Sequence, residues 1–462
     1  MNINGIKYVY LIGAGGIGIS ALGRYFNQKG AKIYGYDRAK GKLCDELINE
    51  GIDIHFEDSP DLIPPVIIKN ENRDCTLIIY TPAVGNNNKE LNYLIKKGFK
   101  AYKRAEVLGI ITKKYKGLAI AGTHGKTTIS TCLAHILNNS KLGCSAFLGG
   151  IAKNYNTNFL SSLTSELVVI EADEFDRSFL QLNPEMALIS SIDADHLDIY
   201  DNYETLMEGF ISFINRINKG GNLIIKKDLL ETNQVPNHIN LFSYSLDSIA
   251  DFYAENIRLH NCKYTFDLVS PFFNIKDLHT KLSGLINVEN TVAACSLAIL
   301  AGAKANEIKQ SLEIFSGIRR RFDIRVNNEK YIYIDDYAHH PKEIEAVIMS
   351  IRDLFPKKKI TVVFQPHLYS RTKDFADEFA NSLDMADEIL LLDLYPAREK
   401  PISGVSSAII FDKMKLKNKI MCSKEELLNI IKNNRPELLL TIGAGDIDKV
   451  VEPIENLVKS LL

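Results

Sequence analysis

Short apolar runs alternate with longer amphipathic segments along most of the chain. Tyr8–Ile12 is a continuous apolar run, which is typical of a strand buried on both faces of a parallel sheet. The segment from Ile17 to Phe26 repeats its apolar residues near the period of an α-helix. Further segments rich in apolar residues predict strands at 32–36, 76–80, 118–121, 167–170, 187–192, 331–334, 360–364, 388–392 and 438–442. This alternation predicts an α/β fold built on parallel sheets.

The middle of the chain departs from this alternation. Residues 251–277 alternate apolar and polar positions, as antiparallel strands do, whereas 287–301 and 306–315 have helical spacing. The pattern is interrupted by a polar stretch at 112–117 and again near Arg321. A chain of 462 residues is long enough for about three domains. We therefore predict three α/β domains, at 1–112, 113–320 and 321–462.

Composition narrows the class of protein. The chain is 46% hydrophobic and 24% charged, as ordinary soluble globular proteins are. Its 55 basic and 57 acidic residues give a net charge of −2, which argues against a nucleic-acid partner. No apolar run approaches the ~18 residues of a membrane span, so we expect no membrane partner. Seven cysteines without a CxxC pair favour a reducing compartment, and we expect a cytoplasmic protein.

A glycine pattern lies between the first predicted strand and helix, at Gly13, Gly15, Gly16 and Gly18. In such a pattern the first glycine makes a tight turn, the second lets a diphosphate approach, and the third lets the helix pack on a strand. Asp37 ends the next strand, where a carboxylate can bind a ribose hydroxyl. A nicotinamide cofactor fits this spacing. A nucleotide-diphosphate sugar also fits, together with Gly16 and Ser20, and the spacing does not choose between the two.

The sequence GTHGKTT, residues 122–128, follows the predicted strand 118–121 and precedes an amphipathic helix. Backbone N–H groups of such a loop bind phosphates, the lysine, Lys126, neutralises their charge, and the hydroxyl of Thr127 can bind Mg²⁺. The spacing differs from the common phosphate-loop pattern, because Gly122 stands three positions before Gly125 instead of five. We predict that this phosphate loop binds a nucleoside triphosphate.

Acidic and histidine residues follow the next predicted strands. Glu171 ends one strand and His196 stands just past another, and the carboxyl ends of parallel strands meet at one edge of a sheet. A carboxylate and an imidazole there could share a metal, although a lone histidine after a strand is as often structural. We interpret the neighbouring carboxylates as a solvated acidic rim; they are Asp173, Glu174, Asp193 and Asp195.

The last third of the chain carries three polar clusters next to strands. Three arginines stand at 319–321, and arginine is suited to bidentate contact with phosphate or carboxylate. The other two clusters follow strands and contain Asp335, Asp336, His339 and His340, and then His367 and Arg371. Three such clusters in one unit predict half of an active site.

Six motifs in this order resemble those of the Mur ligases of peptidoglycan synthesis: GTHGKTT, EADE, DADHLD, RRF, DDYAHHP and FQPHLYSRT. With the early glycine pattern, the resemblance covers essentially the whole chain. It implies a Rossmann-like N-terminal domain for a UDP-sugar, a P-loop ATPase-like central domain, and a Rossmann-like C-terminal domain that closes on ATP and binds the amino acid. It also implies ATP and Mg²⁺ as cofactors, and is compatible with a monomer or a homodimer.

The resemblance implies a role for particular residues. The implied catalytic residues are Lys126, Glu171, His196, Arg320 and Arg321. The implied ATP-binding residues are Gly122, Thr123, His124, Gly125, Lys126, Thr127, Thr128, Asn287, Asn290 and Asp336, and the metal ligands are Thr127, Glu171 and His196. The implied UDP-sugar site contains Gly13, Gly15, Gly16, Gly18, Ser20 and Asp37, and the amino-acid site contains His339, His367 and Arg371.

DDYAHHP and the glycine pattern point within the family to one reaction. It joins L-alanine to the lactyl carboxylate of UDP-N-acetylmuramate through an acyl phosphate, a step toward the cell wall that sets cell shape and division. A related ligase that recycles a murein tripeptide shares the later motifs but usually lacks the glycine pattern. A second alternative is a nicotinamide-dependent dehydrogenase, but the phosphate loop would have no role in such an enzyme. A non-catalytic nucleotide-binding scaffold is the third alternative.

The sequence departs from the family pattern at two positions. Ile286 stands where the family usually has a histidine before Asn287, and Leu368 stands where the alanine-joining member often has an arginine. These two changes put part of the adenine and amino-acid contacts in question. Other Mur ligases carry a carbamylated lysine near the metal. No lysine of this chain matches that position, and the alanine-joining member is expected to do without it.

Overall fold

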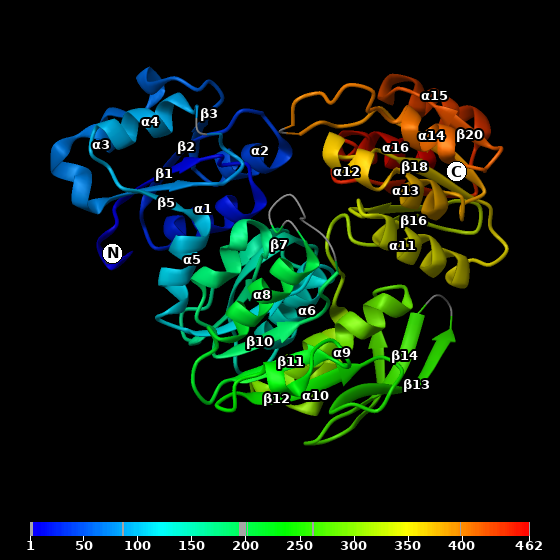
Figure 1. The fold of residues 1–462 in the computed structure, drawn as a ribbon, viewed down its shortest axis with the longest axis horizontal. Helices are drawn as coiled ribbons and strands as arrows, with labels where there is room; N and C mark the ends of the chain where they lie inside the picture. Colours follow the sequence, from blue (N-terminus) through cyan, green and yellow to red (C-terminus); the bar gives the residue numbers. More distant parts are fainter. Residues whose placement is uncertain are drawn as a thin grey trace. The chain divides into compact units, whose positions relative to one another are not determined.

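A computed structural model describes residues 3–85, 87–193, 200, 202–260, 263–397 and 399–461, and within these residues the strands form three sheets (Figure 1). Contacts divide the chain into two compact units. The first unit contains residues 1–257, 265–279 and 289–316, and the second contains 258–264, 280–288 and 317–462. None of the described helices is long and apolar enough to cross a membrane.

The N-terminal sheet has five strands in the order β3-β2-β1-β4-β5, and every neighbouring pair is parallel. Its strands are β1 (Tyr8–Ile12), β2 (Lys32–Tyr36), β3 (Asp53–His55), β4 (Thr76–Tyr80) and β5 (Ala101–Lys103). The helices of this part are α1 (Ile17–Gln28), α2 (Lys42–Asn49), α3 (Pro65–Ile68), α4 (Lys89–Lys96) and α5 (Arg104–Thr112). The last four residues of β1 are fully buried, as expected for an apolar run between two parallel neighbours.

The central sheet has ten strands in the order β15-β14-β13-β12-β11-β10-β6-β9-β7-β8. They are β6 (Lys116–Ala121), β7 (Ser145–Ala152), β8 (Thr157–Leu160), β9 (Leu167–Glu171), β10 (Met186–Ile189), β11 (Asn222–Lys226), β12 (Asn240–Ser245), β13 (Phe252–His260), β14 (Lys263–Val269) and β15 (Ile275–Thr280). The 3₁₀ segment η4 (Phe175–Gln181) follows β9, and the helices are α6 (Lys126–Asn138), α8 (Tyr203–Ile214), α9 (Leu285–Leu300) and α10 (Ala305–Ile314). Strand β6 pairs in parallel with β9 and β10, so the phosphate loop leaves the middle of the sheet.

The C-terminal sheet has six strands in the order β16-β17-β21-β18-β19-β20, and only the edge pair β16–β17 is antiparallel. The strands are β16 (Asp323–Asn327), β17 (Ile332–Asp336), β18 (Ile360–Phe364), β19 (Glu388–Leu391), β20 (Lys419–Met421) and β21 (Leu438–Ile442). The helices are α11 (Pro341–Leu354), α12 (Tyr369–Asp374), α13 (Ala376–Leu383), α14 (Ala408–Lys413), α15 (Lys424–Asn434) and α16 (Asp448–Ser460). Insertion of β21 between β17 and β18 is the strand order of a doubly wound sheet, in which ligands bind at the carboxyl ends of the strands.

The predicted α/β fold with parallel sheets is confirmed. The apolar runs that predict β1, β2, β4, β18 and β21 coincide with those strands residue for residue. The run 187–192 extends further than its strand, because β10 ends at Ile189 and the next two serines contact the phosphate loop. The alternating stretch 251–277 does contain strands, but β13 joins the sheet in parallel with β12. Alternation reports one-sided burial and not strand direction, so this pairing was not foreseen.

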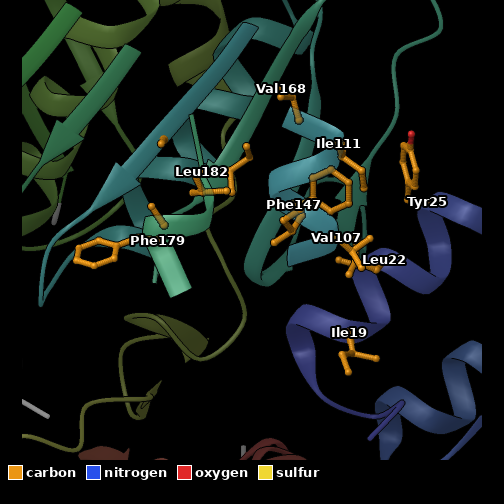
Figure 2. Close-up of a cluster of buried hydrophobic side chains, with 14 of the residues drawn as sticks. Ile19, Leu22, Tyr25, Val107, Ile111, Phe147, Val168, Phe179 and Leu182 are labelled. Atoms are coloured by element: carbon orange, nitrogen blue, oxygen red, sulfur yellow. The ribbon is translucent and has the colours of Figure 1, made fainter. Parts of the chain in front are cut away.

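One hydrophobic cluster joins the N-terminal and central sheets within the first unit. Figure 2 shows side chains of α1, α5, β7, β9 and η4 gathered in this cluster, among them Leu22, Val107 and Phe147. The ring of Tyr25 lies 5.6 Å from that of Phe147, measured between centroids. Because α1 packs on β7 and β8 as well as on β1 and β2, and α5 packs on η4 as well as on β4 and β5, the two sheets share one core.

A buried polar network occupies the other face of the N-terminal sheet. The carboxylate of Glu90, on α4, is fully buried and accepts hydrogen bonds from the Tyr10 hydroxyl at 2.7 Å and the Ser59 N–H at 3.1 Å. The Tyr10 oxygen also lies 2.9 Å from Nε2 of His55. Burial raises the pKa of Glu90 to about 7, against the lowering effect of its hydrogen bonds from Tyr10 and Ser59. The folded chain therefore holds a proton on Glu90 at a pH where the unfolded chain has lost it.

Replacing Glu90 by Gln should stabilise the chain, relative to the native protein, increasingly as the pH rises from about 5 to about 7.5. Because the pKa of Glu90 is higher in the folded chain than in the unfolded chain, Glu90 contributes to the free energy of unfolding of the native protein. This contribution is fully present below the unfolded-state pKa and is lost as the pH rises through the folded-state pKa. The difference in the free energy of unfolding between the variant and the native protein should reach about 3 kcal/mol at most. Melting temperatures of both proteins across this range check it, and a difference that does not change with pH would contradict it.

Candidate active site

The phosphate loop requires glycine at two of its positions. Gly122 has φ = +128° and Gly125 has φ = +80°, backbone conformations that other residues rarely adopt. A Cβ atom on Gly122 would lie 2.2 Å from Oγ of Ser190, and one on Gly125 would lie 2.6 Å from Oδ1 of Asn290. The loop is therefore packed closely against the end of β10 and against helix α9.

Hydrogen bonds from the end of β10 hold the loop in place. Oγ of Ser191 accepts from the His124 N–H at 2.9 Å and lies 2.9 Å from Oγ1 of Thr123. Oγ1 of Thr123 also accepts from the Asp193 N–H at 3.0 Å, and the Ser190 hydroxyl donates to the His124 carbonyl. Neither serine was predicted from the sequence. Their signal was their place directly after a buried strand, where polar residues face the edge of the sheet.

Lys126 is buried beside an acidic partner. Its Nζ lies 2.8 Å from each carboxylate oxygen of Glu174 and donates to the Gly122 carbonyl at 2.6 Å. The Lys126 side chain is 13% exposed and that of Glu174 is 0% exposed. Burial alone lowers the pKa of Lys126, but the charges of Glu174, Asp173 and Glu171 outweigh it, so the pKa is raised and the ammonium stays charged. A cation is thus held at the start of α6, where phosphates bind.

The interpretation of a solvated acidic rim is wrong for Glu174, which is fully buried. It holds for the side chains of Asp173 and Asp193 only in part, since they are 35% and 32% exposed and lie near Arg104 and His124 respectively. The fourth carboxylate, that of Asp195, lies outside the described residues. Glu174 was misassigned because sequence shows a run of acidic residues but not which of them faces a lysine.

The predicted metal ligands are placed only in part. Glu171 stands at the end of β9, where its Oε2 accepts from the Gly149 N–H at 3.2 Å. Thr127 is buried in the first turn of α6. Hydroxyl and carboxylate oxygens are hard donors, the kind that Mg²⁺ prefers, so these two residues fit that ion. The third predicted ligand, His196, lies outside the described residues, and the described part of the chain holds no cluster of three or more metal-binding side chains.

The glycine turn, residues 13–18, is held by Asp37. Oδ2 of Asp37 accepts from the Gly15 N–H at 2.8 Å, and its Oδ1 accepts from the Ala39 N–H at 3.0 Å. A Cβ atom on Gly15 would lie 2.6 Å from Sγ of Cys44, and Gly13 has φ = +86°. Asp37 therefore shapes the turn itself, in addition to its predicted part in sugar binding.

The third glycine faces a side chain and not a strand. A Cβ atom on Gly18 would lie 2.2 Å from Nη1 of Arg104, so the predicted reason for this glycine is corrected. Nη2 of Arg104 also lies 3.7 Å from Oδ2 of Asp173, which places a guanidinium group between the glycine turn and the acidic end of β9. Ser20 is fully buried, and its hydroxyl accepts from Nδ2 of Asn158 at 2.9 Å. Arg104 is a basic residue of this region that was not predicted from the sequence.

In the second unit, Asp336 and two of the arginines lie close together. The Asp336 carboxylate accepts from the Phe322 N–H at 2.6 Å and the Ala338 N–H at 2.7 Å. Burial raises the pKa of Asp336 to about 6, although Arg321 and both hydrogen bonds lower it. The guanidinium groups of Arg320 and Arg321 lie 5.3 and 5.0 Å from the centroid of the Tyr337 ring. Both arginines therefore stack on one tyrosine beside a buried carboxylate.

The two arginines differ in their other contacts. Arg320 donates to Oδ2 of the buried Asp335 at 3.2 Å and to the Gly443 carbonyl at 2.6 Å. These bonds tie Arg320 to the loop after β21, which begins GAGD and was not singled out from the sequence. Gln365 also holds that loop, because its amide donates to Oδ1 of Asp446 at 2.9 Å and accepts from the Ile447 N–H at 2.8 Å.

The predicted amino-acid residues come together in part. The rings of His339 and His367 lie 6.2 Å apart, and the ring of Tyr395 stacks on His367 at 5.9 Å, between centroids in each case. Arg371 lies on α12, directly after these residues. Leu368, which replaces the arginine expected there, has φ = +70° and donates its N–H to the Tyr395 carbonyl at 3.0 Å.

The two asparagines predicted to bind adenine lie three residues apart on α9, and both are buried. Nδ2 of Asn287 donates to the Ser283 carbonyl at 2.7 Å. Asn290 packs against the phosphate loop, because its Oδ1 would lie only 2.6 Å from a Cβ atom placed on Gly125. Ile286, which stands where a histidine is expected, is 41% exposed.

Comparison with known proteins covers nearly the whole chain. Three family models match in order, described as the Mur ligase family catalytic domain (residues 8–116), the Mur ligase middle domain (120–298) and the Mur ligase glutamate ligase domain (320–445). A UDP-N-acetylmuramate–L-alanine ligase of Parabacteroides distasonis is 49% identical over 457 residues, which are 99% of this chain and 98% of the relative.

Two solved structures also resemble the chain. The UDP-N-acetylmuramate–alanine ligase of Thermotoga maritima has a TM-score of 0.83 at 25% identity, over 98% of this chain and 100% of that one. A murein peptide ligase of Psychrobacter arcticus has a TM-score of 0.70 at 18% identity, over 99% of each chain, which is a likeness of fold alone.

Replacing Glu174 by Gln should lower the melting temperature without nucleotide and enlarge the upward shift produced by saturating ATP. The substitution leaves a buried ammonium group without its counter-charge, a change that costs about 3–5 kcal/mol in buried pairs. A bound triphosphate would restore the missing negative charge and so would stabilise the variant more than the native chain. Thermal melts with and without ATP measure both effects.

The matched control is Glu166→Gln, because Glu166 pairs with Lys116 on the surface at 3.2 Å. This control should melt like the native protein and show the native ATP shift. An ATP shift in Glu174→Gln that is no larger than the native one would contradict the prediction.

Proposed function

This chain belongs to the Mur ligase family, and we propose that it is an ATP-dependent ligase that joins L-alanine to the lactyl carboxylate of UDP-N-acetylmuramate. The observation that carries the proposal is the 49% identity, over 99% of the chain, to a relative with that name. The buried cation of the phosphate loop supports the ATP-dependent part. We assign the reaction to the cytoplasmic synthesis of peptidoglycan precursors.

The proposed reaction has two steps. The lactyl carboxylate first attacks the γ-phosphoryl group of ATP, which gives an acyl phosphate and ADP. The amine of L-alanine then attacks the acyl carbon, loses a proton, and expels inorganic phosphate as the amide forms. The first step brings two anions together, so it needs fixed positive charge around the transferred group.

Residues of the phosphate loop supply part of that charge. We propose that the N–H groups at the start of α6 and the Lys126 ammonium bind the β- and γ-phosphates. Lys126 would then exchange its contact with Glu174 for one with the triphosphate. We propose that Thr127, Glu171 and His196 hold Mg²⁺, which when bound would neutralise charge on the phosphate oxygens.

Roles for the remaining predicted residues rest on the resemblance and on their local contacts. Residues of the glycine turn, with Asp37 and Ser20, are proposed for the UDP-sugar. Asn287, Asn290, Asp336, Arg320 and Arg321 are proposed for ATP, and His339, His367 and Arg371 for the amino acid. Of the two arginines, Arg321 is our choice for a phosphate contact, because Arg320 is already bonded to Asp335 and to the Gly443 carbonyl.

The proposal is tested by phosphate release with ATP, Mg²⁺ and UDP-N-acetylmuramate while the amino acid is varied. We expect release with L-alanine, and compare glycine, L-serine and a murein tripeptide in the same assay. Release with the tripeptide alone would replace the proposal by the recycling activity. Thermal melts with ATP and with NADH, run separately, address the dehydrogenase: stabilisation by NADH and not by ATP would favour it. ATP binding without amino-acid-dependent release would indicate a scaffold.

Replacing Lys126 by Ala should reduce alanine-dependent phosphate release by about 100-fold or more while the chain remains folded, because the transferred phosphoryl group loses a fixed positive charge. The matched control is Lys116→Ala, a lysine whose side chain is 61% exposed in the same unit. The control should keep native activity. Native rates of release by a folded Lys126→Ala protein would contradict the assigned role of this lysine.

A further inference from the structure

We propose that Asn158 is a positioning residue, which holds helix α1 against the central sheet so that the glycine turn keeps one distance from the phosphate loop. The inference rests on the proposed function, because it takes the glycine turn to bind the sugar nucleotide. It concerns the first unit alone, which contains the turn, the loop and Asn158.

Asn158 lies on β8 and is fully buried, and its amide group contacts α1 at three places. Nδ2 donates to Oγ of Ser20 at 2.9 Å and to the carbonyl of Ile17. Oδ1 accepts from Nη1 of Arg24. One side chain of the central sheet therefore holds the first two turns of α1.

Arg24 extends this contact to the end of helix α2, which flanks the N-terminal sheet. Its side chain is 5% exposed, and its guanidinium group binds Glu50, with Nε 2.8 Å from Oε2 and Nη2 2.6 Å from Oε1. Glu50 directly follows α2. The Arg24 guanidinium that Asn158 binds is thus already held by Glu50. If β8 and α1 moved apart, Arg24 could not follow Asn158, and the hydrogen bond between them would break.

Apolar contacts surround these hydrogen bonds but cannot replace them. The Tyr25 ring of α1 lies 5.9 Å from the Phe159 ring of β8, between centroids, and Figure 2 shows Tyr25, Leu22 and Ile19 along the same helix. Hydrophobic burial is non-directional, so α1 could slide on this surface and lose little of it. Hydrogen bonds from a buried amide have partners at fixed positions, and leaving them unmade is costly. They therefore select one register of α1.

The register of α1 matters because the glycine turn lies at the start of α1, whereas the residues proposed for Mg²⁺ and the triphosphate belong to the central sheet that Asn158 joins to α1. Gly16 caps the start of α1, and its carbonyl accepts from the Ser20 N–H at 2.9 Å. On the other side, β8 pairs with β7, and the Gly149 N–H of β7 bonds to Glu171. A shift of α1 would thus move the glycine turn relative to the residues proposed for Mg²⁺ and the triphosphate.

The proposed first step is sensitive to such a shift. The carboxylate is carried on a sugar nucleotide, so its distance from the γ-phosphoryl group depends on where the nucleotide is bound. Reacting atoms need an approach of about 3–3.5 Å, and a misplacement of about 1 Å can reduce a rate by about 100-fold. Asn158 would touch neither substrate and would act through α1.

Replacement of Asn158 by Ala tests the inference, with Asn88→Ala as the matched control. Asn88 is also buried in the first unit and caps α4 by accepting the Leu91 N–H at 2.8 Å, away from the junction. Both variants should lose thermal stability. Only Asn158→Ala should reduce kcat, and with it kcat/KM for UDP-N-acetylmuramate, by about tenfold to 100-fold, because the reacting groups are misplaced. The Kd for ATP should stay within about twofold of the native value in both, because the phosphate loop keeps its contacts with Ser190 and Ser191.

A second variant separates the donor bonds from the acceptor bond. Asn158→Asp keeps an oxygen for Arg24 but has no N–H for Ser20 and Ile17, so it should show the same kinetic change even where Asn158→Ala folds poorly. Loss of stability with native kinetic constants would overturn the inference and leave Asn158 a structural residue. Equal weakening of ATP and sugar-nucleotide binding would also overturn it. Calorimetric titration of the native chain with UDP-N-acetylmuramate tests the proposed function separately from the role of Asn158. Absence of binding in that titration would refute the proposed function itself.

Discussion

A buried ammonium group needs an opposite charge, and at the phosphate loop Glu174 supplies it. This requirement organises the middle of the first unit. Lys126 begins α6, Glu174 follows β9, and the two can meet only because β6 and β9 are neighbours in the sheet. The Gly122 carbonyl completes the contact and forces the loop to curl around the cation. A triphosphate would then enter a loop whose backbone is already shaped and whose cation is already in place, and it would have to displace the Glu174 contact of Lys126.

Where residues are buried on both sides, sequence predicts local structure well. The strands β1, β18 and β21 lie between parallel neighbours and are apolar except for one threonine in each of β18 and β21, and such runs have sharp ends. Prediction is weaker where a strand ends at a contact made far along the chain. The run after β10 contains Ser190 and Ser191, whose hydroxyl groups bond to the loop about 66 residues earlier in sequence. Their place after a buried strand puts both serines at the edge of the sheet, but no local pattern identifies their partners in the loop.

The candidate site divides in the same way. The glycines of the phosphate loop could be found from sequence because the turn between a strand and a helix needs backbone conformations that glycine adopts, and Lys126 could be found from its place beside them. Glu174 and Arg104 could not, because each is defined by a partner from another element. Gly18 illustrates the difference: its position in the motif was recognised, but the reason for it is the guanidinium group of Arg104. The resemblance to a family supplied roles for the second unit that periodicity alone could not.

The core that α1 and α5 share with β7 and η4 has a consequence for taking the molecule apart. A fragment ending after α5 would contain α1 and α5 but lack β7 and η4, so the faces of both helices that pack on these elements would be exposed. Leu22, Val107 and Ile111 are fully buried in the intact chain and would meet water. Such a fragment would be prone to self-association, so the N-terminal sheet should be expressed together with the sheet that follows it.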